Sequence, residues 1–356
     1  MMATLHTPIT KALNIRLPII QAPMAGGPTT PELVAAVSNS GGMGSFAAAV
    51  LGPQAIAEGV ARTRQLTDKP FSINLFVLDT PKPSADEIAR GQALLAPMRA
   101  ELGLPPATPL ARYCEPFEGQ FEAVLEAAPA LATFTFGILT GQQVERLKSR
   151  GCLVSGTATN VAEARAWADV GADLICAQGS EAGAHRGTFI GRYEDSMIGT
   201  MALVPQVVDA VKVPVIAAGG MMDGRGIAAS LVLGAGAAQL GTAFLTCPEA
   251  GTHPGWRKLL TEMPETSTAA TIAYSGRMAR GITNDFMRRM AAHWGDIPAY
   301  PVQNALTGEI RAAAGKAGRT EYMSLWAGQG LPMSRSLPAA ELMAQFEAEL
   351  RRAVGA

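Results

Sequence analysis

The sequence predicts an α/β protein, a (β/α)8 or TIM barrel that carries a mainly helical cap. Eight short apolar runs are spaced along residues 18–245, and helical segments with clear capping residues separate most of them. The chain has 356 residues, which is more than the roughly 250 of a typical barrel. The surplus length predicts a smaller additional domain.

The eight runs are apolar throughout rather than alternating, which is typical of parallel strands that helices cover on both faces. The expected strands are PIIQAPM (18–24), GMGSFAA (42–48), FSINLFV (71–77), ATFTFG (132–137), CLVSGTA (152–158), DLICAQG (173–179), VPVIAAGG (213–220) and AAQLGTAFL (237–245). A doubly wound sheet is the alternative architecture, but eight units of this regularity favour closure into a barrel.

The helices between the strands begin at recognisable N-terminal caps. The expected capping residues are Thr30, Thr140, Asn160 and Asp223. Pro31 stands at the first position of the helix after Thr30, and Glu163 stands at the capping-box position after Asn160.

Two stretches break this rhythm and divide the chain into domains. Residues 1–250 are expected to form the barrel, with a Pro- and Ala-rich excursion at about 78–116 that is too long for an ordinary βα loop. We expect this excursion to pass over the barrel mouth and to join the cap. Residues 251–356 contain further helical patterns and are expected to form the mainly helical cap.

Composition and charge indicate which classes of partner and which cellular compartment to expect. A net charge of −1 without a basic stripe predicts no nucleic-acid partner. No apolar run is long enough to span a bilayer, and MMATLHTPIT lacks the pattern of a secretory signal. The four cysteines form no CxxC pair and the histidines no metal-ligand cluster, so we expect core thiols in a reducing, cytoplasmic setting and no metal. The cysteines are Cys114, Cys152, Cys176 and Cys247.

Glycines close the last strands, and in barrels the active site lies at the carboxyl ends of the strands. Gly179 ends the sixth run, Gly219 and Gly220 end the seventh, and the eighth contains Gly241. Such glycines let backbone N–H groups approach a phosphate, and the helix that begins near Asp223 would add its positive end. Alternatively they only permit tight turns. The glycine motifs of P-loop and Rossmann sites are not present.

Two amides and one histidine are expected at the same edge. Asn74 and Gln178 each offer a donor and an acceptor in one plane, which suits either the edge of a flavin or a satisfied core amide. His185 lies in the loop SEAGAHRGTF, where it is a candidate general base, neutral donor to a substrate oxygen or brace of the loop. Glu181 and Arg186 are expected to pair with each other or with the cap.

Several motifs together resemble the nitronate monooxygenase family, formerly called 2-nitropropane dioxygenases. They are QAPMAGGPTTPELVAAVSNSGGMGS, SINLF, AQGSEAGAHRGTF and AAGGMMDGRGIAASLVLGAGAAQLGTAFL. The resemblance continues through TIAYSGRMARGITNDF, YPVQNALTGEIRAAA and EYMSLWAGQG, a tail similar to the class I branch. The barrel motifs alone are shared with flavin-dependent enoyl reductases and related quinone reductases.

The resemblance implies a barrel that binds FMN non-covalently, beneath a helical substrate-binding domain. The FMN contacts that it implies are Ala22, Pro23, Met24, Asn74, Gln178, Gly183, Gly220, Gln239, Leu240, Gly241 and Thr242. The strand-end glycines Gly179 and Gly219 join this set as cofactor-binding candidates. The histidine of the family's EAGGHRG motif, the proposed catalytic base, falls on His185.

Two positions depart from the family pattern. Ala184 replaces the usual second glycine, which would change the loop if that glycine has a positive φ. Thr135 stands where some relatives carry a histidine, so a role of that second imidazole does not transfer. Tyr300 is expected either to line the pocket or to pack the cap onto the barrel.

The implied reaction is the oxidation of an alkyl nitronate, such as propionate 3-nitronate, by O2 to a carbonyl compound and nitrite. His185 would remove the α-proton of a neutral nitroalkane, or would bind a nitronate that arrives as the anion. One alternative is an NAD(P)H-dependent FMN quinone or enoyl-thioester reductase, and another is a phosphate- or nucleotide-binding sensor without catalysis. The partners expected are the small-molecule nitronate and O2, for a monomer or homodimer.

Overall fold

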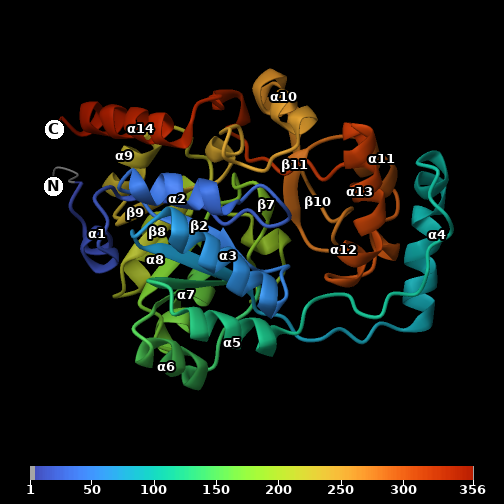
Figure 1. The fold of residues 1–356 in the computed structure, drawn as a ribbon, viewed down its shortest axis with the longest axis horizontal. Coiled ribbons are helices and arrows are strands. Elements are labelled where there is room, and N and C mark those ends of the chain that lie inside the picture. Colours follow the sequence, from blue (N-terminus) through green and yellow to red (C-terminus); the bar gives the residue numbers. More distant parts are fainter. Residues whose placement is uncertain (1–4, 356) are drawn as a thin grey trace.

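The computed structural model describes residues 5–355 and contains a barrel of eight parallel strands (Figure 1). The strands are β1 (Ile19–Gln21), β2 (Gly44–Ala47), β3 (Phe71–Phe76), β4 (Leu131–Thr135), β5 (Leu153–Ala158), β6 (Leu174–Gln178), β8 (Val215–Ala218) and β9 (Ala237–Leu240). Their order is β1-β9-β8-β6-β5-β4-β3-β2, and a parallel bridge between Ile20 and Met43 brings β1 beside the start of β2. The predicted barrel is confirmed.

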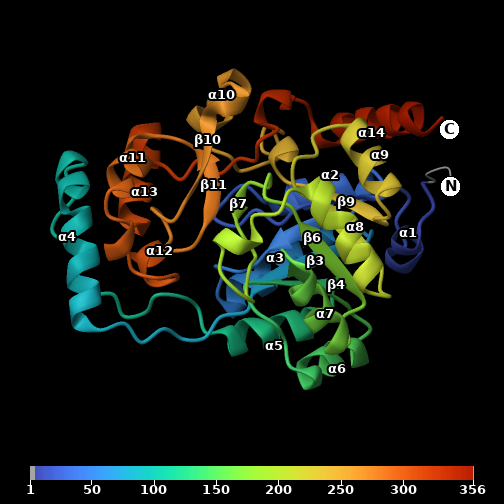
Figure 2. The same ribbon diagram turned by 180° about the vertical axis from the view of Figure 1, so that it is seen from behind.

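Helices surround these strands (Figure 2). They bury apolar side chains against the strands. They are α2 (Pro31–Asn39), α3 (Pro53–Leu66), α5 (Phe117–Ala127), α6 (Gly141–Ser149), α7 (Val161–Asp169), α8 (Thr200–Ala210) and α9 (Gly224–Val232). At the amino-terminal end of the strands, Ile9 and Leu13 of α1 (Pro8–Leu13) pack with apolar residues from inside the barrel. This end is therefore filled, and the opposite end remains for a site.

The predicted caps are confirmed at Thr30, Thr140, Asn160 and Asp223, each of which accepts a backbone N–H of its helix. The capping box predicted for Glu163 is wrong. Its carboxylate bonds to the backbone N–H and hydroxyl of Thr159, at 2.6 and 2.7 Å, rather than to Asn160. It also accepts from the loop amides of Phe189 and Ile190, so tertiary contacts take the place of the local motif.

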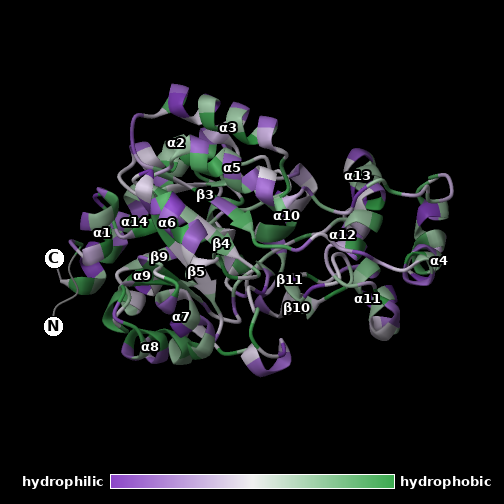
Figure 3. Ribbon diagram, turned by 90° about the horizontal axis from the view of Figure 1, so that it is seen from below, coloured by the Kyte–Doolittle hydropathy of each residue, from purple (hydrophilic) through white to green (hydrophobic). Residues whose placement is uncertain are grey.

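The excursion after β3 was expected to pass over the barrel mouth, and the structure places it elsewhere. It contains α4 (Ala85–Glu101), which packs on the outer side of the cap, against α12 (Val302–Leu306) (Figures 1 and 3). Leu95 and Met98 of α4 are buried in the apolar core of the cap. This core accepts the apolar face of α4, and the excursion therefore joins the cap from outside.

The cap contains a small antiparallel sheet that the sequence pattern did not predict. The sheet has the order β10-β11-β7, and consists of β10 (Thr268–Thr271), β11 (Ala279–Ile282) and the two-residue strand β7 (Ala184–His185). Its helices are α10 (Pro254–Glu262), α11 (Asp285–Ala291), α12 and α13 (Gly308–Ala317). Through β7, the loop that carries His185 becomes an edge strand of this sheet.

The last helix, α14 (Ala339–Val354), belongs to the barrel and not to the cap as predicted for 251–356. It packs on α9 and α2, where Leu342, Phe346 and Leu350 join the main apolar core. Short 3-10 helices complete the fold: η1 (Glu194–Ser196), η2 (Thr242–Phe244), η3 (Glu265–Ser267), η4 (Trp294–Asp296), η5 (Thr320–Tyr322) and η6 (Leu331–Met333).

None of the helices within residues 5–355 combines the length and apolar composition needed to cross a membrane. Residues 1–4, which begin the segment examined for a secretory signal, lie outside the described residues, as does residue 356.

Candidate active site

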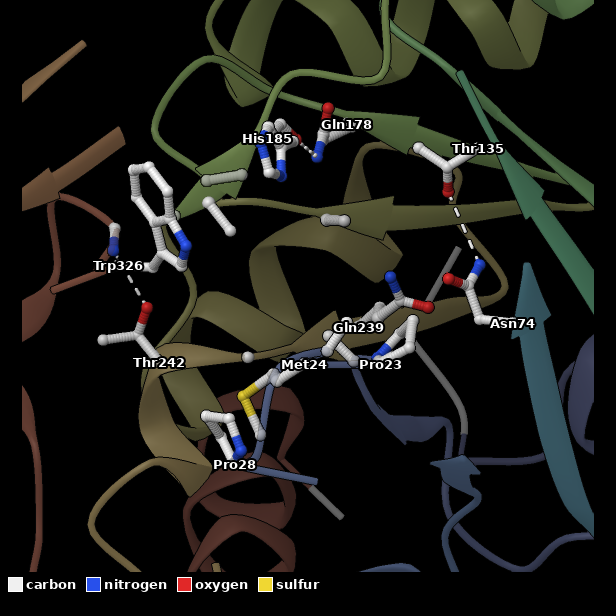
Figure 4. Close-up of a pocket in the computed structure, with 18 of the residues that line it drawn as sticks. Pro23, Met24, Pro28, Asn74, Thr135, Gln178, His185, Gln239, Thr242 and Trp326 are labelled. Atoms are coloured by element: carbon white, nitrogen blue, oxygen red, sulfur yellow. Dashed lines mark hydrogen bonds between the residues drawn. The ribbon is translucent and has the colours of Figure 1, made fainter. Parts of the chain in front are cut away.

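A cavity of about 390 Å³ lies at the carboxyl ends of the barrel strands, between the barrel and the cap (Figure 4). Its volume is within the range of roughly 300–1,000 Å³ usual for small-molecule sites. Most of the predicted cofactor residues line it: Ala22, Pro23, Met24, Asn74, Gln178, Gly183, Gly219, Gly220, Gln239, Gly241 and Thr242. His185 also lines it, so residues from five strand ends and the His185 loop meet at one cavity.

Two predicted cofactor residues do not line the cavity. Leu240 points away from it, into the apolar core between strands and helices, because neighbours in a strand face opposite sides. Gly179 lies against Thr200, whose Oγ1 would be 1.9 Å from a Cβ placed there. The glycine at 179 therefore permits close packing of loops and offers no surface to a ligand in the cavity.

The glycines after β8, which are predicted to contact a phosphate, have a backbone conformation that favours glycine. Gly219 and Gly220 have φ of 111° and 77°, in the left-handed region that other residues avoid. The helix predicted to assist them has its first N–H groups bonded to side chains of the protein. Asp223 accepts the N–H groups of Arg225 and Gly226, at 2.9 and 3.2 Å, and so occupies the N-terminus of α9.

A carboxylate from α14 completes that coverage, since Glu349 accepts the N–H of Gly224 at 2.9 Å. Residues 223–226 do not line the cavity, and the contribution predicted from the α9 dipole stays a prediction. What remains at the cavity are the glycine backbone and the hydroxyl of Thr242. Thr242 accepts an N–H from Gly328 at 2.9 Å and keeps its own O–H to donate.

The two amides have different surroundings. Gln178 donates to the carbonyl of His185 at 3.0 Å and accepts from the N–H of Gly187 at 2.8 Å, so it braces the loop on both sides of the histidine. Asn74 donates to the hydroxyl of Thr133 at 3.0 Å and also faces Thr135 (Figure 4). Both amides are engaged with the protein while they line the cavity.

His185 is held in a mostly aromatic wall. Its Nε2 lies 2.8 Å from the Oγ of Ser275, and its ring lies edge-on to Phe136 and Tyr300, with centroid separations of 5.4 and 5.5 Å. Burial lowers the pKa of His185 to about 3, and the positive charges of Arg277 and Arg311 act in the same direction. At neutral pH the imidazole is therefore uncharged.

The sequence profile of the nitronate monooxygenase family matches residues 6–349. The chain belongs to this family. It is 43% identical over 341 residues to a probable nitronate monooxygenase of Staphylococcus aureus, strain Newman, with 95% of each chain covered. It is thus an enzyme of the nitronate monooxygenase family, an oxidoreductase.

Solved structures give the same relationship. A nitroalkane oxidase from Streptomyces ansochromogenes superposes with a TM-score of 0.90 at 39% identity, covering 97% of this chain and 98% of the other. FabK from Thermotoga maritima has a TM-score of 0.77 at 28% identity, covering 99% and 98%. The fold is therefore also that of FabK.

Ala184 shows how this family member keeps the loop without the usual glycine. The alanine itself adopts the left-handed conformation, with φ of 59°. Such a conformation costs an L-residue roughly 1–2 kcal/mol, and Gln178 together with pairing in the β7–β11 ladder holds it in place.

Glu181 and Arg186 do not pair with each other. Glu181 accepts the backbone N–H and the hydroxyl of Thr200, at 2.8 and 2.9 Å. Arg186 is buried and donates to the backbone carbonyl of Ser196 at 3.1 Å and to that of Gln178. Burial lowers the pKa of Arg186 to about 10. Both side chains hold loops around the site, and the ion pair predicted between the two is wrong.

Sequence reasoning missed the cap residues that complete the cavity. Asn304, Arg311 and Trp326 line it together with Tyr300. Arg311 donates to the backbone carbonyl of Asn304 at 2.7 Å and to its Oδ1 at 3.2 Å. No carboxylate within residues 5–355 forms an ion pair with Arg311, and none lines the cavity. The only signal in the sequence is a basic residue beside Ile310 on an otherwise apolar stretch of α13.

Proposed function

We propose that the protein is an FMN-dependent nitronate monooxygenase, which oxidises alkyl nitronates with O2 to carbonyl compounds and nitrite. The observation that carries this proposal is the charge of the cavity wall. Arg311 is its one arginine or lysine, and no acidic side chain lines it among the described residues. A nitronate is a small anion, and a guanidinium without a carboxylate partner is suited to bind one.

The lining residues fit a flavin with a phosphate tail. The glycine backbone at 219–220 and the hydroxyl of Thr242 would hold the phosphate, while Pro23, Met24 and Gln239 would contact the ring system. A Cβ built at Gly241 would enter the space beside Ala22 and Met24, and the buried hydroxyl of Ser155 on the cavity wall has no protein partner. Bound FMN would supply the electron transfer from the substrate and the reaction with O2.

The protein side chains have separate roles in this proposal. Arg311 binds the negative charge of the nitronate, and His185 receives the α-proton when the substrate is a neutral nitroalkane. Phe76, Phe136 and Trp326 surround His185 and limit the access of water to the reacting carbon.

The likeness to FabK supports one second candidate, an NAD(P)H-dependent FMN quinone or enoyl-thioester reductase. Anaerobic mixing of the yellow protein with NADH separates the two functions. Rapid bleaching of the flavin would favour the reductase, whereas the monooxygenase is expected to react slowly or not at all.

The direct test is an aerobic assay of the purified protein with propionate 3-nitronate, with nitrite release as the readout. We expect nitrite together with the corresponding carbonyl product. His185→Asn is compared with wild type on the nitronate and on the neutral nitro form. Absence of nitrite from wild type would refute the proposed activity, and near-normal turnover of both forms by the variant would refute a catalytic role of His185.

A further inference from the structure

The two nitrogens of His185 have different surroundings. Nε2 lies 2.8 Å from the Oγ of Ser275, a residue that is 1% exposed. Nδ1 has no hydrogen-bond partner within residues 5–355, and it is not among the buried side-chain atoms that lack one. Nδ1 therefore remains open to the cavity that His185 lines.

The contacts of Ser275 favour one direction for its hydrogen bond with Nε2. Its Oγ lies 3.1 Å from the carbonyl oxygen of Arg277 and 3.4 Å from the Arg277 N–H. A serine hydroxyl has a single proton, and a carbonyl oxygen can only accept. Ser275 therefore donates to the Arg277 carbonyl, and its lone pairs are left for the N–H of Arg277 and for Nε2.

Nε2 must then donate to Ser275, and it carries the proton of the neutral ring. In the opposite arrangement, Ser275 would donate to Nε2 and would turn a lone pair towards the Arg277 carbonyl at 3.1 Å. That carbonyl would then lose its hydrogen bond in the described part of the chain, and such a bond contributes about 0.5–1.5 kcal/mol.

The charges around His185 keep the ring neutral, so the two tautomers are the states to be distinguished. Arg277, just before β11, and Arg311, on α13, are the cations that act on it, and Tyr300 is the neighbouring titratable group. None of the described carboxylates lies within ion-pair distance of the ring. A neutral hydroxyl thus orients this imidazole, where an acidic partner would favour the imidazolium.

We infer that Ser275 is a positioning residue that fixes the Nε2–H tautomer of His185 and leaves the Nδ1 lone pair to take the substrate α-proton. The inference rests on the proposed function. In this step the C–H bond of the nitroalkane breaks and its electron pair stays on the nitronate. The proton forms an N–H bond at Nδ1, so an imidazolium and a nitronate result from two neutral groups.

This assignment also separates the tasks of the two groups in the cavity. A lone pair on Nδ1 repels the oxygens of a nitronate that arrives as the anion, so His185 does not bind that charge. Arg311 binds it instead. His185 is then needed for the neutral nitro form and has little effect on the turnover of preformed nitronate.

Nitrogen NMR of the holoprotein with ¹⁵N-labelled histidine tests the tautomer without turnover. His185→Gln identifies the resonances of His185 among the four histidines. We expect a pyridine-like shift for Nδ1 and a pyrrole-like shift for Nε2 at neutral pH. The reverse pattern, or a pair of averaged shifts, would overturn the inference. In Ser275→Ala, the averaged shifts of a mixed population are expected, and unchanged shifts would show that Ser275 does not fix the tautomer.

Kinetics test the consequence. Ser275→Ala is expected to lower kcat/KM for nitroethane by about 10–100-fold and that for ethyl nitronate by less than about threefold. Ser275→Thr retains the hydroxyl and should restore most of the loss. Ser230→Ala removes a buried hydroxyl from α9, outside the cavity lining, and should leave the ratio of the two substrates unchanged.

An equal loss with both substrates would point to a structural role of Ser275 and would refute the inference. If wild type oxidises neither substrate, the proposed function fails, and the NMR shifts still decide the tautomer.

Discussion

Glu163→Gln tests whether one buried carboxylate holds the loop that follows His185. The side chain of Glu163 is fully buried. One oxygen accepts from Thr159, at 2.6 Å from the N–H and 2.7 Å from the hydroxyl. The other accepts from Phe189 and Ile190, at 2.5 and 2.9 Å. The substitution keeps the shape of the side chain and replaces one oxygen by an NH2 group.

The loss of stability in Glu163→Gln depends on which pair of donors the NH2 group of the new side chain faces. If its NH2 group faces Phe189 and Ile190, two buried N–H groups lose their acceptor. If it faces Thr159, the hydroxyl can rotate and accept, and only the N–H of Thr159 is left unpaired. One unpaired buried donor costs about 1–3 kcal/mol, and the bonds to the loop lose the benefit of a charged acceptor. We therefore expect Glu163→Gln to lower the free energy of unfolding by about 2–4 kcal/mol.

Urea unfolding at pH 7 measures this loss. Glu145→Gln is the matched control, because Glu145 is exposed on α6 and its replacement should change stability by less than about 0.5 kcal/mol. A change for Glu163→Gln no larger than that of the control would show that the four bonds contribute little net stability. The assignment of Glu163 as the anchor of this loop would then be wrong.

Three further predictions concern the cavity. Gly241→Ala places a Cβ 3.4 Å from that of Ala22, an ordinary contact, so the free energy of unfolding should change by less than about 1 kcal/mol. The Kd for FMN, measured by flavin fluorescence, should rise about tenfold. An unchanged Kd would exclude Gly241 from the cofactor site. Arg311→Met should raise the KM for a nitronate about 10–100-fold in steady-state nitrite assays, with Arg311→Lys between the two, and an unchanged KM would remove Arg311 from anion binding. The pKa of His185 falls from 6.5 to about 3 on folding, so below pH 6.5 the unfolded chain binds a proton that the folded chain does not. Between pH 6.5 and 5.5, urea titrations should therefore show wild type losing about 1 kcal/mol more stability than His185→Asn. Equal losses of stability in the two proteins would contradict the low pKa.

The barrel was predictable because its signals are local. Continuously apolar runs bounded by glycines, and caps such as Thr140, depend on residues a few positions apart. The residues that close the strands could also be predicted, because parallel strands end at one edge. Which of these residues face the cavity could not be predicted. Gln239 and Leu240 are neighbours in β9, and only the pleat of the strand decides that the first faces the cavity and the second the core.

The cap residues were not predictable because their roles depend on contacts between distant segments. Ser275 reaches His185, 90 residues away in sequence, only because β11 pairs with the two-residue strand β7. The apolar stripe of α14 shows that the helix packs on something, but not that its partner is the barrel. A two-residue strand has no periodicity to detect, so the sheet that brings Ser275 to His185 left no pattern in the sequence.

The neutral partner of His185 also bears on how one cavity can handle both forms of a substrate. A carboxylate in the place of Ser275 would raise the pKa of the imidazole and would compete with the nitronate for the charge of Arg311. A hydroxyl orients the ring and adds no charge, so Arg311 keeps its full attraction for an anion. The imidazolium formed by proton removal then lies beside the cations Arg277 and Arg311, where the new nitronate alone offsets its charge. The ion pair is stable only while the nitronate remains, and oxidation of the nitronate should therefore return His185 to its neutral form.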